Sequence, residues 1–464
     1  MILWLQWWSL VRELRPAFSR TRTFLWFALA LAGLCVRTDH LGVTSLVRAL
    51  GLKEDCYDRL LDWFHSPGVS LDVLTRLWVR LVLTVLSPFL LVVNGRLVLL
   101  ADGIKVAKTG RKMPGVKPLH QNSETKPQFI FGHSCQALAL VVRYASSFMA
   151  IPLACRIHEG IKPSASDKFG LFEKLIALLD SMAVSRSLYL VADSYYAAAK
   201  VIKPLLKKGQ HLITAVRLSA VAYEQPKPPF EFRVGRRLKY GTYLKLKLFF
   251  RKPRLFTEAP SPIYGEKNVT LRYRVLDLCW RSVGQLSRFV LVIHPTRGKK
   301  ILLSTDLSLT PLQIIELFGV RFKIEACFKQ AVHTVGAYSY HFWLRSKRGT
   351  RHSLNHILNT KPEAYRRAVH RKVHAYHAFI QTAFIAQGLL QILALTKSEL
   401  VWRHFGSWIR TIRPGLAPSE FVTICALRHT LPAFLANNSS DIILVKFLTD
   451  RIDLSRSKGL LAAA

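Results

Sequence analysis

Acidic residues are scarce in this chain of 464 residues, which holds 28 Asp and Glu against 67 Lys and Arg. The formal net charge is +39, and the sequence pI is about 10.4. Basic residues occur along the whole chain, a distribution typical of proteins that contact many phosphates. A basic ribosomal or membrane-surface protein is the alternative. Because half of the residues are hydrophobic, the chain is not a disordered basic arm.

Cysteine pairs and nucleotide-binding loops are also missing. The seven cysteines are odd in number, scattered, and never spaced as Cys-x-x-Cys, which argues against a zinc ribbon and a disulfide framework. They are most simply reduced thiols in the core of a cytosolic protein. The chain contains neither a Walker A loop nor Gly-x-Gly-x-x-Gly, so we expect no nucleotide cofactor.

Long uninterrupted hydrophobic runs are few. The apolar run from Phe24 to Val36 would rise only about 20 Å as a helix, whereas a bilayer core is roughly 30 Å thick. A second run, VLTVLSPFLLVV, is interrupted by Pro88. The first residues lack the basic start and small-residue cleavage site of a signal peptide. We therefore expect buried helices and no membrane partner.

Hydrophobic periodicity divides the chain into five parts. Residues 1–90 have helical spacing, which predicts a DNA-binding region or, equally well, a dimerisation bundle. Strand-like runs alternate with helices over 91–217, the first part of a catalytic core. Residues 218–306 lose helical spacing and predict a β-rich insertion. A core helix carrying Glu325 is expected within 307–345, and a helical region for DNA contact or dimerisation within 346–464.

The order of elements in the second part predicts the fold. An Asn-Gly hairpin signal at 94–95 opens the first strand, and two further strands follow. A helix with Ser166 and Asp167 as candidate N-caps precedes a strand, a helix and a final strand. This is the order of an α/β, ribonuclease-H-like core with a mixed sheet. Asp102 would end the first strand and Asp193 the fourth, which places the two carboxylates side by side.

Carboxylates beside buried strands cost desolvation energy, and here they suggest metal binding. With Glu325, Asp102 and Asp193 supply the oxygen ligands that Mg²⁺ or Mn²⁺ prefers. Two ions roughly 4 Å apart activate the nucleophile and stabilise the leaving oxygen in phosphodiester cleavage. We expect Asp102 to bridge both ions, Asp193 to hold one and Glu325 the other. The alternative is that each acid is a helix cap or an ion-pair partner.

Four segments resemble bacterial insertion-sequence transposases of the DDE superfamily, in the group with a β insertion before the catalytic Glu. They are ADGIKVAKTGRKMPGVKPLHQ, GHSCQALALVV, VADSYYAA and FGVRFKIEACFKQAVHTVGAYSYHFW. The signature of that group is Tyr-x2-Arg-x3-Glu-x6-Lys. Arg321 and Glu325 match it, whereas Phe318 replaces the Tyr and Val332 the Lys. Lys329, one helical turn after Glu325, is a candidate substitute for the lysine.

The resemblance implies cut-and-paste transposition in the bacterial cytoplasm, at the nucleoid. A homodimer would bind double-stranded DNA at terminal inverted repeats, cleave it with metal, and join the strands to target DNA. Arg321 and Lys329 would contact phosphate, Lys105 and Lys108 would hold the transferred strand, and Trp280 would stack on an extruded base. For Arg321 the alternative is a surface ion pair, and for Trp280 a place in the core of the insertion.

Two other functions are compatible with the same residues. A ribonuclease-H-like nuclease would use the three acids without strand transfer. A domesticated transposase that has lost catalysis would bind DNA without cutting it. The departures from the signature at Phe318 and Val332 are compatible with this function, whereas the three intact acids argue against it.

Overall fold

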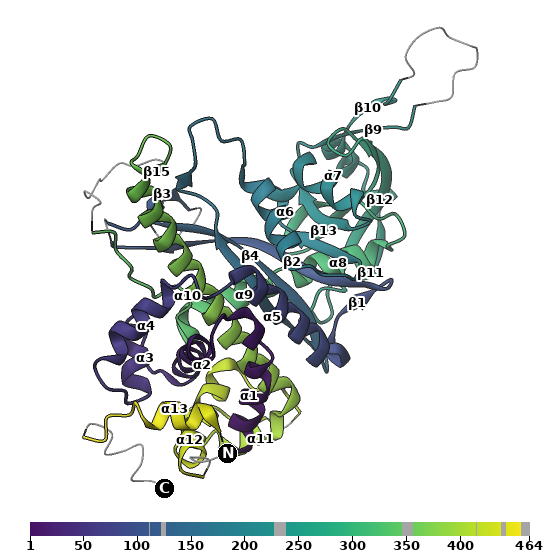
Figure 1. Ribbon diagram of the computed structural model, residues 1–464. Helices are drawn as coiled ribbons and strands as arrows, with labels where there is room; N and C mark the ends of the chain where they lie inside the picture. Colours follow the sequence, from purple (N-terminus) through teal and green to yellow (C-terminus); the bar gives the residue numbers. More distant parts are fainter. Residues whose placement is uncertain are drawn as a thin grey trace.

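The computed structural model describes residues 1–110, 112–121, 127–226, 238–345, 356–413, 415–437 and 442–455. Figure 1 shows the N- and C-terminal helices packed together at one end of the molecule and a long twisted sheet extending away from them. The main hydrophobic core runs through both parts without a break.

The N-terminal part is helical, as its periodicity predicts. Its helices are α1 (Ile2–Arg12), α2 (Thr21–Val36), α3 (Thr44–Ala49), α4 (Cys56–Phe64) and α5 (Leu71–Val85). The apolar run in α2 is buried at every position from Phe24 onward. It packs against α10 (Glu363–Thr396), so the run serves as a core helix.

The C-terminal part consists of α10 followed by α11 (Ser398–His404), α12 (Glu420–Asn437) and α13 (Ile443–Thr449). Among the described residues, α10 is the one helix long and apolar enough to cross a membrane, and its apolar window is entirely buried in the protein. It lies against α2, α12 and strand β5 (Ser147–Ile157). Burial on all sides accounts for the absence of a single polar face.

The sheet has the mixed order expected of a ribonuclease-H-like core. Strands β2 (Arg96–Ala107), β7 (Leu188–Ala192) and β8 (His211–Val216) are parallel neighbours, and β4 (Phe129–Tyr144) pairs antiparallel with both β2 and β5. The Asn-Gly signal forms the predicted hairpin between β1 (Val92–Val93) and β2, with φ of 46° at Asn94 and 73° at Gly95.

Helices α6 (Leu171–Ser181) and α7 (Ala199–Lys207) connect the parallel strands. The prediction of N-caps at Ser166 and Asp167 is wrong, because α6 begins only after Gly170. The backbone N–H of Gly170 donates to the Glu173 carboxylate at 3.1 Å, which satisfies a donor at the helix start.

The insertion is β-rich, as predicted, but it is not a separate sheet. Strand β14 (Gly298–Ser304) pairs antiparallel with β8 of the core, so that β12 (Thr270–Trp280) and β13 (Gln285–His294) extend the same sheet. The shorter strands are β3 (Lys117–His120), β6 (Ile161–Lys162), β9 (Val221–Tyr223), β10 (Tyr243–Lys245), β11 (Thr257–Pro260) and β15 (His356–Ile357). One face of the insertion carries its own small core, covered by the 3-10 helix η4 (Leu246–Arg251).

The helical segment before and through Glu325 is interrupted. Helix α8 (Pro311–Val320) begins at a capping box in which Thr310 and Gln313 satisfy each other's backbone N–H groups. After Arg321 and Phe322 the chain resumes as α9 (Lys323–Gln330), followed by the π-turn η6 (Ala331–Val335). The sequence predicted one continuous helix over this segment.

Buried Arg37, just after α2, holds the far end of this segment. Its Nε donates to the carbonyl of Val335 at 3.0 Å, and its Nη2 donates to that of Gly336 at 2.9 Å. Gly336 has φ of 69°, and a Cβ atom there would lie 2.3 Å from Nη2 of Arg37. The N-terminal helices therefore contact the C-terminal end of the segment that carries Glu325.

Candidate active site

Asp102 lies where β2 loses one of its two neighbours. Its predecessor Ala101 pairs with Ala192, the last residue of β7, while β2 itself continues to Ala107 beside β4. The sequence predicted that the first strand ends at Asp102. The strand continues past Asp102, and only its parallel pairing with β7 ends at this point. The Oδ1 atom of Asp102 accepts from the N–H of Gly103 at 2.8 Å.

Asp193 follows β7 directly and so lies beside Asp102, at the same edge of the parallel strands. It caps the short helix η3 (Ser194–Tyr196), since its Oδ1 accepts from the N–H of Tyr195 at 3.0 Å. The hydroxyl of Thr214 on β8 donates to its backbone carbonyl at 2.7 Å. Backbone hydrogen bonds on both sides fix the position of this residue.

Arg321 joins the third acid to the first. Its Nη1 lies 2.9 Å from Oδ2 of Asp102, and its Nη2 lies 2.8 Å from Oε1 of Glu325. The side chains of Arg321 and Asp102 are 20% and 17% exposed, whereas that of Glu325, in the first turn of α9, is 56% exposed. One guanidinium therefore spans a half-buried carboxylate and an open one.

The pKa values show that negative charge is concentrated here. Burial raises the pKa of Asp102 to about 6, against the lowering effect of Arg321 and the Gly103 N–H; Asp193 and Glu325 raise it further. The pKa of Asp193 is also raised, first by burial and then by Glu325, against the Tyr195 N–H and Arg321. A further cation at this edge would lower the pKa values of Asp102 and Asp193.

The donor set fits a hard divalent cation, since it consists of carboxylate oxygens. In the described parts of the chain, however, no three His, Cys, Asp or Glu side chains are grouped tightly enough to hold one ion as they stand. At this edge the guanidinium of Arg321 lies between Asp102 and Glu325. Metal binding by all three acids therefore requires this side chain to move.

The residues expected to bind DNA differ in position. Lys329 is exposed in the last turn of α9. Lys105 is exposed and donates to the carbonyl of His120, but it lies three residues after Asp102, on the opposite face of β2. A DNA contact by Lys329 or Lys105 therefore stays a prediction.

The prediction that Lys108 holds the transferred strand is wrong. Its side chain is 6% exposed and donates to the carbonyls of Tyr338 and Tyr340, the latter at 3.1 Å. Its ammonium also lies 3.7 Å from the centroid of the Tyr340 ring. Burial lowers its pKa to about 7. The ammonium therefore lies inside the protein and does not face DNA.

Trp280 ends β12 and packs at the boundary between the two cores, with its ring edge-on to Phe289 at 6.2 Å. The partly buried position of Trp280 matches the alternative prediction, a place in the core of the insertion, better than stacking on an extruded base. Phe318 and Val332, the two departures from the signature, are both half-buried against the main core. The Arg321 guanidinium lies 5.9 Å from the Phe318 ring centroid, so Phe318 packs beside the site without a hydroxyl.

Sequence reasoning missed a cationic cleft of about 400 Å³ that continues from Arg321 between α8 and the insertion. Lys300 and Arg297 line it, and the Lys300 ammonium lies 5.1 Å from the Phe318 ring centroid. The pKa of Lys300 is lowered first by burial and then by Arg321 and Arg297. Only the Lys-Lys pair in β14 signalled this cleft, and a basic pair on a strand is not specific.

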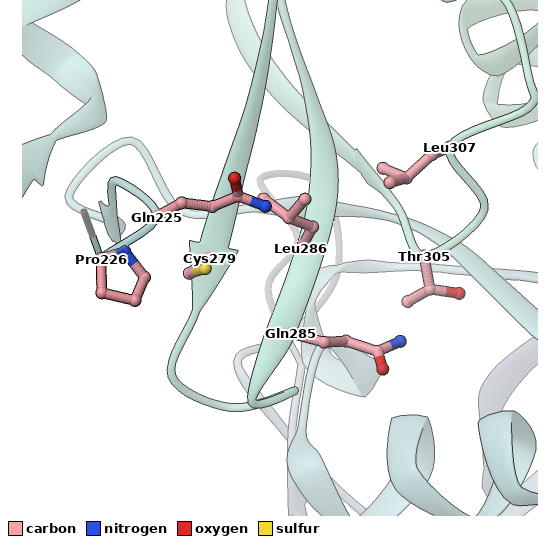
Figure 2. A pocket seen from close by; sticks show the side chains of 7 residues that line it. All are labelled: Gln225, Pro226, Cys279, Gln285, Leu286, Thr305 and Leu307. Atoms are coloured by element: carbon pink, nitrogen blue, oxygen red, sulfur yellow. The ribbon is translucent and has the colours of Figure 1, made fainter. Parts of the chain in front are cut away.

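A second cleft, of about 590 Å³, lies on the insertion at the junction with the core (Figure 2). Among the residues that the structure describes, no acidic or basic side chain lines it, so the described lining is unsuited to metal or phosphate. The residues around it are Gln225, Pro226, Cys279, Gln285, Leu286, Thr305 and Leu307.

Comparison with known proteins identifies the class. The family model described as Transposase DDE domain matches residues 163–336, a segment that contains Asp193, Arg321 and Glu325 and begins after Asp102. The chain therefore carries a DDE transposase domain. Transposases of this class generally use divalent metal ions. No curated protein matches the chain.

Among solved structures, the chain is similar to the cryo-EM structure of a piggyBac transposase synaptic complex with hairpin DNA. The identity is 12%, the match covers 92% of this chain and 76% of the other, and the TM-score is 0.36. A likeness at this TM-score adds no argument about the site, which rests on the geometry above.

Proposed function

We propose that this DDE transposase cleaves DNA at the terminal inverted repeats of its own element and joins the released strands to target DNA. The observation that carries the proposal is the gathering of Asp102, Asp193 and Glu325 around Arg321. Three acids of a chain with so few acids share one sheet edge although they are far apart in sequence.

Asp102, Asp193 and Glu325 are the residues that would hold two Mg²⁺ or Mn²⁺ ions, with Asp102 common to both. When bound, the metal supplies charge stabilisation at the attacking and leaving oxygens of phosphodiester cleavage. The chain's own contribution is to fix the carboxylates: Gly103 and Tyr195 donate backbone N–H bonds to Asp102 and Asp193. These bonds favour the charged form, which is the form that binds a cation.

In this proposal Arg321 has two positions. Without DNA its guanidinium neutralises the half-buried Asp102 and the exposed Glu325, which otherwise repel each other. With DNA it turns to the phosphate beside the cleaved bond, for which a guanidinium's paired donors are suited. Lys329, exposed in the last turn of α9, contacts the neighbouring DNA backbone.

The partner is double-stranded DNA, as the net charge of +39 favours. We assign DNA binding to the helices of residues 1–90, and DNA contact or dimerisation to residues 346–464. The proposed assembly is a homodimer on paired DNA ends in the bacterial cytoplasm.

An excision assay with the gene's own flanking DNA tests the proposal. Wild type and Asp193→Asn are compared in Mg²⁺, with Asp180→Asn as control, since Asp180 is exposed at the end of α6 and lies outside both regions assigned to DNA binding. We expect double-strand release at the element ends by wild type and control, and none by Asp193→Asn. Cleavage without joining to target DNA would indicate a nuclease. Specific binding without any release would indicate a silent DNA-binding protein.

A further inference from the structure

The insertion carries a basic surface that the catalytic site does not use. It consists of five exposed cations on β10 and on the segment through η4 and η5 (Pro253–Leu255), namely Lys245, Lys247, Arg251, Lys252 and Arg254. Within the described residues none of them forms an ion pair. We call these five residues together with Arg274 the η4 patch.

A cleft of about 540 Å³ lies within the η4 patch, lined by Lys245, Lys252 and Arg274 together with Tyr243, Leu248 and Phe249. No acidic side chain in the described part of the chain lines it. Three cations around one hollow, without a carboxylate, repel one another unless an anion neutralises them.

Arg274 is the fixed member of the η4 patch. It projects from β12 on the same side as Leu276 and Leu278, which contribute to the insertion core. Its guanidinium lies 4.9 Å from the centroid of the Phe249 ring. Its Nη1 atom is buried and has no hydrogen-bond partner among the described residues. An aromatic ring therefore holds this guanidinium beside the cleft with hydrogen-bonding capacity left over.

The described acids of the insertion are paired with cations or do not line the cleft. Asp277 pairs with Arg288 at 2.6 Å, and Glu266 pairs with His294 and Arg297. Glu258 lies opposite Arg272 across β11 and β12, on the same face as Arg274, but it does not line the cleft. Glu224 is exposed beside β10, but it lies on the opposite face from Tyr243 and Lys245. Among the described acids of the insertion, only Glu258 thus lies on the face of Arg274, so the six cations of the η4 patch outnumber the acids beside them.

The hydrophobic core beneath the η4 patch reaches the chain that follows Asp193. Ala197, four residues after Asp193, packs against the insertion core that η4 covers. Strand β9 follows the carboxyl end of β8, the parallel neighbour of β7. DNA bound at the three acids would therefore have a basic surface beside it.

We infer that the η4 patch binds the phosphate backbone of duplex DNA that flanks the cleavage site. The inference rests on the proposed function, which supplies the DNA. The groups that the η4 patch recognises are phosphodiester anions. Lys245, Lys252 and Arg274 contact successive phosphates, and the exposed rings and methyl groups of Tyr243 and Leu248 face the deoxyribose between them. No base is read, so this surface adds affinity and footprint but no sequence preference.

The test measures binding of the full chain to a labelled duplex carrying the element end, over a range of salt concentrations. Lys245→Gln combined with Lys252→Gln is compared with Lys203→Gln combined with Lys207→Gln. The control removes the same charge from α7, whose end at Lys207 lies toward the opposite edge of the sheet from Asp193. The patch variant should lower the slope of log K against log salt by about 2 and weaken binding roughly tenfold, because each phosphate contact contributes about 0.9 to the slope.

Further variants keep the test decisive. Arg274→Gln should lower the slope by about 1, and Lys245→Glu with Lys252→Glu should weaken binding more than the neutral pair does. Slopes equal to wild type in all three would overturn the inference, as would an effect confined to single-stranded DNA of the same sequence. If the wild-type protein binds the duplex but does not cleave it, the proposed function fails while the inference about the η4 patch can still be tested. The salt-dependence slopes of wild type and variants can be compared without cleavage.

Discussion

The Nη1 atom of Arg321 lies 2.9 Å from Oδ2 of Asp102, although the two residues are 219 positions apart in the chain. The same guanidinium reaches Glu325 one helical turn away. It thereby joins the strand that carries the first acid to the helix that carries the third. The resulting charge balance gives the first prediction.

Arg321→Met should lower single-turnover cleavage by about 10²–10³-fold, because it removes a positioned cation beside the reacting phosphate. DNA affinity should change much less, since many other cations contact the backbone. Arg288→Met, which removes a guanidinium paired with Asp277 in the insertion, is the matched control. Equal cleavage by the two variants would contradict a role for Arg321 in the site.

Asp102→Asn should abolish cleavage while leaving DNA binding intact or slightly stronger, because the variant removes a negative charge from the DNA-facing edge. The readouts are cleavage in Mg²⁺ and binding in EDTA. Mn²⁺ titration of the wild-type protein, followed by its paramagnetic effect on water relaxation, should show ions that Asp102→Asn no longer holds. Undiminished Mn²⁺ binding by the variant would argue against Asp102 as a ligand.

Gly336→Ala should lower the free energy of unfolding by roughly 2 kcal/mol or more. The left-handed backbone alone costs an L-residue about 1–2 kcal/mol. In addition, the new Cβ would lie 2.3 Å from Nη2 of Arg37. Gly284→Ala is the control, because Gly284 has φ of 83° and nothing within 4 Å of the added atom. Urea unfolding of both variants measures the difference. Equal losses of unfolding free energy would mean that the Arg37 side chain can move away from the new Cβ without destabilising the protein.

Glu159 should make stability depend on pH in the acid range. Its pKa is lowered to about 2, first by the hydrogen bond with His158 and also by Lys117, whose ammonium lies 2.7 Å away, against the raising effect of burial. The folded pKa lies below the ordinary value of 4.5, so the stabilisation is fully present above about pH 4.5 and is lost as pH falls toward 2.

The difference in urea-unfolding midpoint between wild type and Glu159→Gln should therefore be largest at neutral pH and should shrink by pH 3. Glu224→Gln, at an exposed position after β9, should show no such change between the two pH values. A constant difference for Glu159→Gln across this range would show that its loss acts through packing rather than charge.

Several features followed from short stretches of sequence. Asn94 and Gly95 form the hairpin because both adopt positive φ, which these residue types tolerate. The strands that carry Asp102 and lead to Asp193 were visible as apolar runs, and their order indicated that the two acids lie on neighbouring strands. The apolar run in α2 was too short to span a membrane, and it is buried. Each of these depends on local backbone preference or on the period of burial.

Other features depended on contacts between distant segments. Lys108 is read from sequence as a basic residue near the site, yet carbonyls of Tyr338 and Tyr340, more than 200 positions away, hold it inside the protein. The interruption between helices α8 and α9 at Arg321 and Phe322 cannot be predicted from the spacing of apolar residues in the sequence.

The amino-acid sequence by itself thus determined the order of strands and helices and which residue types could bind metal or phosphate, because these follow from local preference and charge. The tertiary structure alone decided which cation lies against which acid. Burial, hydrogen-bond geometry and the pKa shift of Asp102 arise only when β2, β7 and α9 come together.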